Sequence, residues 1–288
     1  NRSFIVGFKD NNQRQVSVFV NADGTLSAYR GGTENGTGGG IGGATLLGTS
    51  TFAISQDNWF YIEFKATIDN TVGTIDIRVN GNNILSLSGI DTQATSNASA
   101  NVIVFAGNRE GTSALSFDGA DYFDDIYVAD TQAAPSSYAG RIVDFIGDVE
   151  VLPLYANANG ATDQDFTPQG AGDHYVEIDE TTPDEDTTYL ESSTVGHEEF
   201  NAYQDMSTAR TVIGLQLVCR ANKQDAGVRS FKLGIKEGIT NRYGPTEHFP
   251  SAKEYIYHTE ISDKNPATGN QWVAAEVNAD EYGIKVET

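Results

Sequence analysis

Cysteine, basic residues and long apolar runs are all scarce in this 288-residue sequence. The single cysteine, Cys219, excludes an internal disulfide framework and a zinc site built on several cysteines. No run of about 18 apolar residues occurs, so the sequence predicts no membrane-spanning helix. Only 18 Lys and Arg oppose 40 Asp and Glu, a formal net charge of -22. Such a surface repels phosphates and acidic lipid headgroups, which argues against a nucleic-acid binder and against a basic membrane-surface protein.

What the sequence does contain is typical of β-structure. Its 14 Phe, 13 Tyr and 2 Trp suit sheets more than helices, and 39% hydrophobic residues are enough for real cores. Alternating segments at residues 15–20 and 25–29 flank a turn at Asn21–Gly24, and those at residues 74–79 and 84–87 flank Asn80-Gly81. An Asn-Gly pair between alternating runs is a strong hairpin signal. We count roughly nine strands before Ala129, and this regular turn spacing predicts an all-β sandwich or barrel.

The composition changes in the second half and predicts a second domain. Between Arg141 and Arg210 there is no Lys or Arg but there are sixteen Asp and Glu, so we expect long acidic loops around a sandwich. We predict a linker at residues 130–140 and two domains, residues 1–154 and 155–288. The strands that we expect around and beyond the boundary are residues 122–128, 142–146, 149–154, 211–221, 230–236, 254–261 and 282–286, with either a short helix or a strand at residues 270–277.

One candidate metal site lies in an acidic cluster near the end of the first domain. Asp118, Asp121, Asp124 and Asp125 supply the oxygen ligands that calcium prefers, at the rim of the predicted sandwich. The alternative is that Asp124 or Asp125 caps a turn or accepts bonds from backbone amides before the next strand. We predict no other cofactor.

Aromatic side chains form a candidate carbohydrate site. Trp59 and Tyr61 lie on the same face of an alternating segment, residues 59–68, together with Glu63 and Lys65. Exposed aromatic rings can stack on sugars, and Trp272 is a further candidate for this role. The alternative for Trp59 is a place at the edge of the sandwich core.

Enzymatic motifs are incomplete. Glu177, Asp179 and Glu180 resemble part of the Glu-x-Asp-x-x-Glu pattern of sandwich glucanases, but Thr182 stands where the third carboxylate is needed. No Gly-x-Ser-x-Gly nucleophile elbow is present. Cys219 alternates in phase with Leu215 and Leu217, which predicts a buried side chain and not a nucleophile. We therefore predict no catalytic residue.

Three segments of the first domain resemble a concanavalin-A-like (laminin-G-like) sandwich. They are Asn-Trp-Phe-Tyr-Ile-Glu-Phe-Lys at residues 58–65, Gly-Thr-Ile-Asp-Ile-Arg-Val-Asn-Gly at 73–81 and Phe-Asp-Asp-Ile-Tyr-Val-Ala-Asp at 123–130. The resemblance covers most of residues 1–130 and implies that fold, an antiparallel all-β sandwich of the jelly-roll kind. The sequence begins with Asn inside a predicted strand, so we expect that the family's usual N-terminal strands precede it.

The downstream sequence resembles a bacteriophage structural protein family that carries such a sandwich. The segments are residues 146–151, 184–197, 226–230 and 270–272. The resemblance implies a non-enzymatic virion component, either a capsid decoration protein or a part of the tail or a fibre. It also implies contacts with other capsid or tail proteins and a homo-oligomer. The alternatives are a carbohydrate-binding module or adhesin that recognises host-surface glycans and, in third place, a glycan hydrolase.

Overall fold

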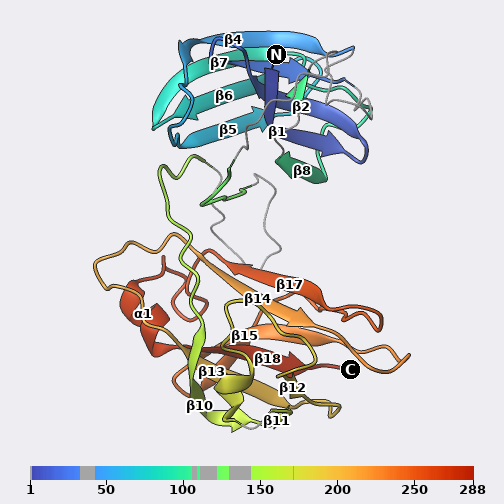
Figure 1. The fold of residues 1–288 in the computed structure, drawn as a ribbon, viewed down its shortest axis with the longest axis vertical. Helices are drawn as coiled ribbons and strands as arrows, with labels where there is room; N and C mark the ends of the chain where they lie inside the picture. The colour runs from blue at the N-terminus through green and yellow to red at the C-terminus, as the bar shows by residue number, and fades with distance from the viewer. Residues whose placement is uncertain (1, 33–42, 106–108, 111–121, 130–143, 171) are drawn as a thin grey trace. The chain divides into compact units, whose positions relative to one another are not determined.

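The computed structural model describes residues 2–32, 43–105, 109–110, 122–129, 144–170 and 172–288 (Figure 1). These residues divide between two compact units, one formed by Asn1–Val128 with Asp144–Val151 and one that includes Leu152–Thr288. The division after Val151 falls three residues before the boundary predicted from composition. The predicted linker, residues 130–140, lies outside the described residues.

The first unit consists of two antiparallel sheets. One has the strand order β4-β3-β2-β1-β8 with β9 beside β1, and the other has the order β5-β6-β7. β1 to β4 are neighbours in chain order in the first sheet, where β8 pairs with the other edge of β1, and β5 to β7 are neighbours in chain order in the second. The strands are β1 (Arg2–Asp10), β2 (Gln13–Val20), β3 (Thr25–Arg30), β4 (Thr45–Ala53), β5 (Ile62–Thr67), β6 (Gly73–Val79), β7 (Asn82–Ile90), β8 (Val102–Phe105) and β9 (Arg109–Glu110).

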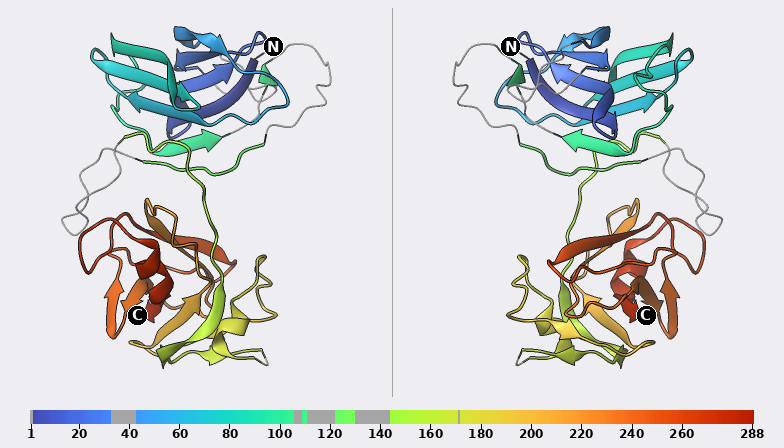
Figure 2. Two further views of the ribbon diagram at one scale, coloured as in Figure 1. Left: turned by 90° about the vertical axis from the view of Figure 1, so that its left-hand side faces the viewer. Right: turned by 90° about the vertical axis from the view of Figure 1, so that its right-hand side faces the viewer.

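The two sheets lie face to face (Figure 2). Aliphatic side chains pack between them. Val16, Val18 and Leu26 of the first sheet are fully buried against Ile75 and Ile77 of the second. Burial of each such side chain contributes about 1.5–3 kcal/mol, which is the main force that holds the layers together. The predicted all-β sandwich is confirmed; the jelly-roll connectivity of the concanavalin type stays a prediction.

The predicted Asn-Gly hairpin is confirmed. Asn80 and Gly81 join β6 to β7 with φ angles of 50° and 78°. A two-residue turn of this kind needs positive φ at both positions, which Asn and Gly tolerate best. The Asn80 side chain also accepts a bond from the Tyr61 amide at 2.9 Å, and this bond positions the chain just before β5.

The second unit contains a five-stranded antiparallel sheet with the order β10-β13-β18-β15-β16 and a two-stranded ribbon, β14-β17. Between them lie Trp272, Val212 and Ile235, with Val277 of the only α-helix in the described part of the chain. The elements are β10 (Ala156–Gln164), β11 (Thr167–Pro168), the 3-10 helix η1 (His174–Glu177), β12 (Leu190–Glu191), β13 (Glu198–Tyr203), β14 (Leu215–Ala221), β15 (Phe231–Glu237), β16 (Thr240–Tyr243), β17 (Ile256–Ser262), α1 (Ala274–Ala279) and β18 (Glu281–Val286).

Several predicted strands are corrected by the structure. Residues 122–128 and 144–154 form no strand, and β5 and β14 begin at Ile62 and Leu215, three or four residues later than predicted. Alternation of apolar residues is not enough to make a strand without a neighbouring edge to pair with. Ile126 and Val128 are 44% and 55% exposed, so this alternation does not mark a buried face.

Candidate functional site

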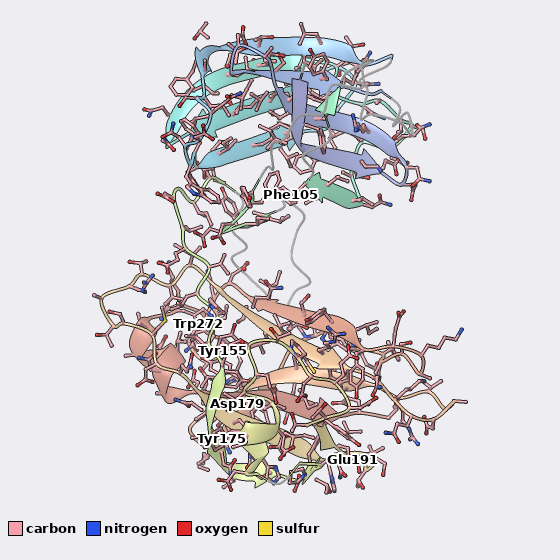
Figure 3. All side chains as sticks on the ribbon, in the orientation of Figure 1. Phe105, Tyr155, Tyr175, Asp179, Glu191 and Trp272 are labelled. Atoms are coloured by element: carbon pink, nitrogen blue, oxygen red, sulfur yellow. The ribbon has the colours of Figure 1, made fainter. Side chains whose placement is uncertain are left out.

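The three aromatic residues predicted to bind sugars occupy different environments. Trp59 lies in the segment before β5 and is 71% exposed, whereas Tyr61 is half-buried. Trp272 is 2% exposed and its indole Nε1 donates to the Ser262 carbonyl at 3.0 Å, within the core of the second unit (Figure 3). Trp272 therefore offers no ring face to a sugar, and its prediction as a platform is corrected.

The candidate calcium ligands are only partly described. Asp118 and Asp121 lie outside the described residues. The Asp124 carboxylate accepts a bond from the Asp125 amide at 2.9 Å, and the Asp125 carboxylate accepts one from the Val151 amide at 2.8 Å. These are the backbone bonds of the turn-cap alternative. Among the described residues no group of three or more His, Cys, Asp or Glu has a metal-binding arrangement; calcium stays a prediction.

A buried carboxylate, Glu63, organises the outer face of the three-stranded sheet. Glu63 is 3% exposed, and its Oε1 accepts bonds from the Tyr127 hydroxyl at 2.7 Å and the Gly147 amide at 3.0 Å. It therefore ties β5 to two segments that contain no strand, residues 122–128 and 144–151. We call Glu63, Tyr61, Tyr127 and Gly147 the Glu63 cluster.

The two phenols of the Glu63 cluster are held protonated. Burial, together with the hydrogen bond to Glu63, raises the pKa of Tyr127 to about 12. Burial, and then the nearby Tyr127 and Glu63, raise the pKa of Tyr61 still further. A phenol next to a carboxylate resists ionisation because a second negative charge would be repelled. The cluster is thus arranged to donate hydrogen bonds at neutral pH.

Phe145 fixes the same segment from its other end. The Arg78 guanidinium lies 4.0 Å from the centre of the Phe145 ring, and Lys65 contacts both this ring and the Asp144 carboxylate, the latter at 3.1 Å. Cation–π contacts of this kind contribute about 0.5–1 kcal/mol at exposed sites. The face that we predicted to display Tyr61, Glu63 and Lys65 is therefore partly covered by the chain's own residues.

In the second unit, Glu199 is the centre of another buried polar cluster. Its carboxylate contacts His174 Nδ1 at 3.0 Å, Gln164 Nε2 at 2.9 Å, Asn201 Nδ2 at 3.1 Å and the Phe166 amide at 3.2 Å. Burial raises the pKa of Glu199, and the donors around it oppose that shift. A buried carboxylate is tolerated when donors surround it in this way.

Lys236 is a buried cation with two acidic partners. It is 3% exposed, and its Nζ lies 3.0 Å from Asp163 Oδ2 and 3.2 Å from Glu281 Oε2. Nζ also donates to Thr162 Oγ1 at 2.5 Å. The two carboxylates raise the pKa of Lys236 against the effect of burial, so the ammonium is retained. The group joins β10 to β15 and β18.

Two histidines lie side by side in the interior of the second unit. His248 and His258 are 6% and 8% exposed, and their rings are 5.4 Å apart, with Phe231 against both. Burial lowers the pKa of each; for His258 the neighbouring His248 lowers it further, and for His248 Glu260 opposes the shift. Both rings are therefore neutral at pH 7.

The glucanase-like acidic motif does not form the expected strand. Glu177 is the last residue of η1 and is buried, with its Oε1 accepting from the Gly172 amide at 3.0 Å. Glu180 instead accepts from the Thr188 hydroxyl at 2.6 Å. Cys219 is half-buried and not fully buried as predicted, and burial of the thiol raises its pKa to about 12, so the thiol is protonated at neutral pH.

Sequence reasoning missed Glu63 as an anchor and missed the clusters of Glu199, Lys236 and the two histidines. One signal was present for Glu63 and Lys236, since each is a charged residue within an alternating strand. The partners of these residues lie up to 84 positions away, as with Glu63 and the Gly147 amide, and spacing along the chain does not reveal such pairs.

Comparison with known proteins finds no matching family, no matching curated protein and no matching solved structure. Within the described residues, no helix is long and apolar enough to cross a membrane.

Proposed function

We propose that this protein is a non-enzymatic structural component of a bacteriophage virion that acts through protein–protein contacts in a symmetric assembly. The resemblance of its downstream segments to a phage structural family is the starting point. The role is a capsid decoration protein or a part of the tail or a fibre, and the partners are other virion proteins.

The observation that carries the proposal is the outer face of the β14-β17 ribbon. Val218, Tyr257 and Ile261 are 57%, 57% and 55% exposed, and the strand pairing places all three on the face opposite the core residues Leu215 and Leu217. Gln216, Arg220 and Thr259 share this face, and the Arg220 guanidinium lies over the Tyr257 ring. Exposed apolar side chains among polar ones are suited to contact with another protein. The buried carboxylates Glu63 and Glu199 bind groups of their own chain, which supports a structural use of these acids.

The experiment is quantitative mass spectrometry of purified particles of the phage that encodes the chain. We expect the protein in a fixed, multi-copy ratio to the major capsid or tail protein. Val218→Asp is expected to lower incorporation at least tenfold, whereas Val72→Asp, a matched change at a 65% exposed position in the first unit, leaves it unchanged. Particles that lack the protein contradict the proposal.

A second candidate function is glycan binding at Trp59. An indole that is 71% exposed and two residues from Tyr61 has the character of a sugar-stacking platform. We expect a glycan array to give signals that disappear in Trp59→Ala and persist in Tyr122→Ala, a control at a 76% exposed aromatic residue. A blank array with the unaltered protein removes this candidate.

A further inference from the structure

One side of the first unit is formed by two edge strands. β4 is the last strand of the larger sheet and β7 is the last strand of the smaller one, and each is nine residues long. The two strands lie side by side across the sandwich (Figure 1). Gly48 of β4 lies against the Leu87 side chain of β7. No described strand pairs with the outer edge of either, so both present unpaired backbone groups.

This side lacks charge. Residues 44–56, which contain β4, and residues 80–90, which contain β7, include no Asp, Glu, Lys, Arg or His. At the chain's average of 20% charged residues, segments of this combined length hold about five. By contrast β5, the opposite edge of the smaller sheet, carries Glu63 and Lys65. We call the surface of β4 and β7 the neutral side.

Edge strands in single-chain proteins are commonly protected by charged residues or proline, because an unprotected edge pairs with other strands. β4 has neither, and it exposes Leu46 and Phe52 by 52% and 41%. The edge of β4 is therefore unprotected, which is typical of a strand that is covered by a partner.

We propose that the neutral side binds a second copy of this chain, with the two β4 strands pairing antiparallel about a two-fold axis. The occupant follows from charge. Two copies with a net charge of -22 each repel one another, and the neutral side lets them approach closely without opposing like charges. A two-fold axis perpendicular to the strands places the same strand of both copies side by side and antiparallel, so the contact is self-complementary and closed.

The inference deepens the proposed function, since contact between copies is part of it, but it is tested on the purified protein alone. Sedimentation velocity and light scattering on the full chain are expected to give a dimer of the 31.0 kDa chain. Thr49, exposed at the middle of β4, is the site for a charge test. Thr49→Glu and Thr49→Lys are each expected to weaken the dimer at least 100-fold, and Thr49→Val to leave it unchanged.

Mixing the two charged variants supplies the decisive readout. Glu and Lys at position 49 lie near the two-fold axis and attract one another, so the mixture is expected to recover dimers. Circular dichroism checks that each variant is folded. A monomeric unaltered protein overturns the inference, and so does a dimer that both charged variants retain. Neither result contradicts the proposed function, because incorporation into particles is measured by a separate experiment.

Discussion

At the scale of single residues, burial decides which ionisable groups affect stability. Asp280, at the end of α1, is 8% exposed, and its Oδ2 has no hydrogen-bond partner in the described part of the chain. Burial, followed by the nearby Glu237 and Glu276, raises the pKa of Asp280 to about 7. His248 and His258 are shifted in the opposite sense, towards the neutral base. Ionisation of Asp280 at high pH and protonation of the two histidines at low pH therefore both lower the stability of the folded state.

Asp280→Asn is expected to stabilise the second unit at pH 8 by roughly 1–4 kcal/mol. A carboxyl whose pKa is raised on folding binds its proton more tightly in the folded state, so stability falls as pH rises from about 4 to about 7. The amide removes that loss. Urea unfolding at pH 8 and pH 4 measures the free energy of unfolding of both proteins. The variant is expected to be more stable than the unaltered protein at pH 8 and to show a smaller difference at pH 4. Asp205→Asn, at an exposed position, is the control, and destabilisation of Asp280→Asn at pH 8 contradicts the prediction.

His258→Phe is expected to make the protein less sensitive to acid. Folding lowers the pKa of His258, so the unfolded chain binds more protons, and stability is lost as pH falls below about 6.5. The rings of His248 and Phe231 contact this ring, Cys219 is its pairing partner across the ribbon, and Glu260 lies beside His248. Urea unfolding is measured between pH 7 and pH 5. Over this range the free energy of unfolding of the variant is expected to fall less steeply than that of the unaltered protein, by up to about 1.4 kcal/mol per pH unit. His197→Gln, as control, is expected to keep the steeper slope.

At the scale of elements, hydrogen bonds to one side chain hold segments that form no strand. Residues 122–128 and 144–151 belong to the first unit because Tyr127 and the Gly147 amide both bind Glu63. Sheet pairing organises β1 to β7 without such help. We therefore expect these two segments to be the most sensitive to a single polar substitution.

Tyr127→Phe is expected to destabilise the first unit by about 1–3 kcal/mol, because it removes a donor to a buried carboxylate. Amide hydrogen exchange at Gly147 is expected to accelerate at least tenfold, while amides in β6 change little. Tyr122→Phe is the matched control, since Tyr122 is 76% exposed. Unchanged exchange at Gly147 shows that the Glu63 cluster does not hold the segment.

At the scale of the whole molecule, each unit has its own core, and the two tryptophans divide between them. Trp272 is buried in the second unit, whereas Trp59 is exposed in the first. We expect acrylamide to quench Trp59 strongly and Trp272 weakly. In the Trp59→Phe variant, the emission shift on urea unfolding is then expected to report the second unit alone. An emission maximum of that variant typical of exposed indole contradicts the burial of Trp272.

Local patterns in the sequence were sufficient for much of the fold. The Asn80-Gly81 turn and the alternating burial of β6 follow from periods and turn residues that span a few positions. The placement of Cys219 on the same strand face as Leu215 and Leu217 also follows from local alternation. β2 is buried on both faces from Arg14 to Phe19, which its alternation did not predict. The place of residues 122–128 did not follow, because their alternation resembles a strand and only a missing partner edge prevents one.

By itself the sequence determined the all-β class, the acidic character and the uncharged stretches at residues 44–56 and 80–90, because these depend on composition and on neighbours along the chain. Only the tertiary structure decided that Trp272 is a core residue and that Lys236, Asp163 and Glu281 form one cluster. It also brought the two uncharged stretches together as adjoining edges of one sandwich. Burial and proximity depend on which strands pair, and strand pairing joins residues whose separation in the sequence carries no local pattern.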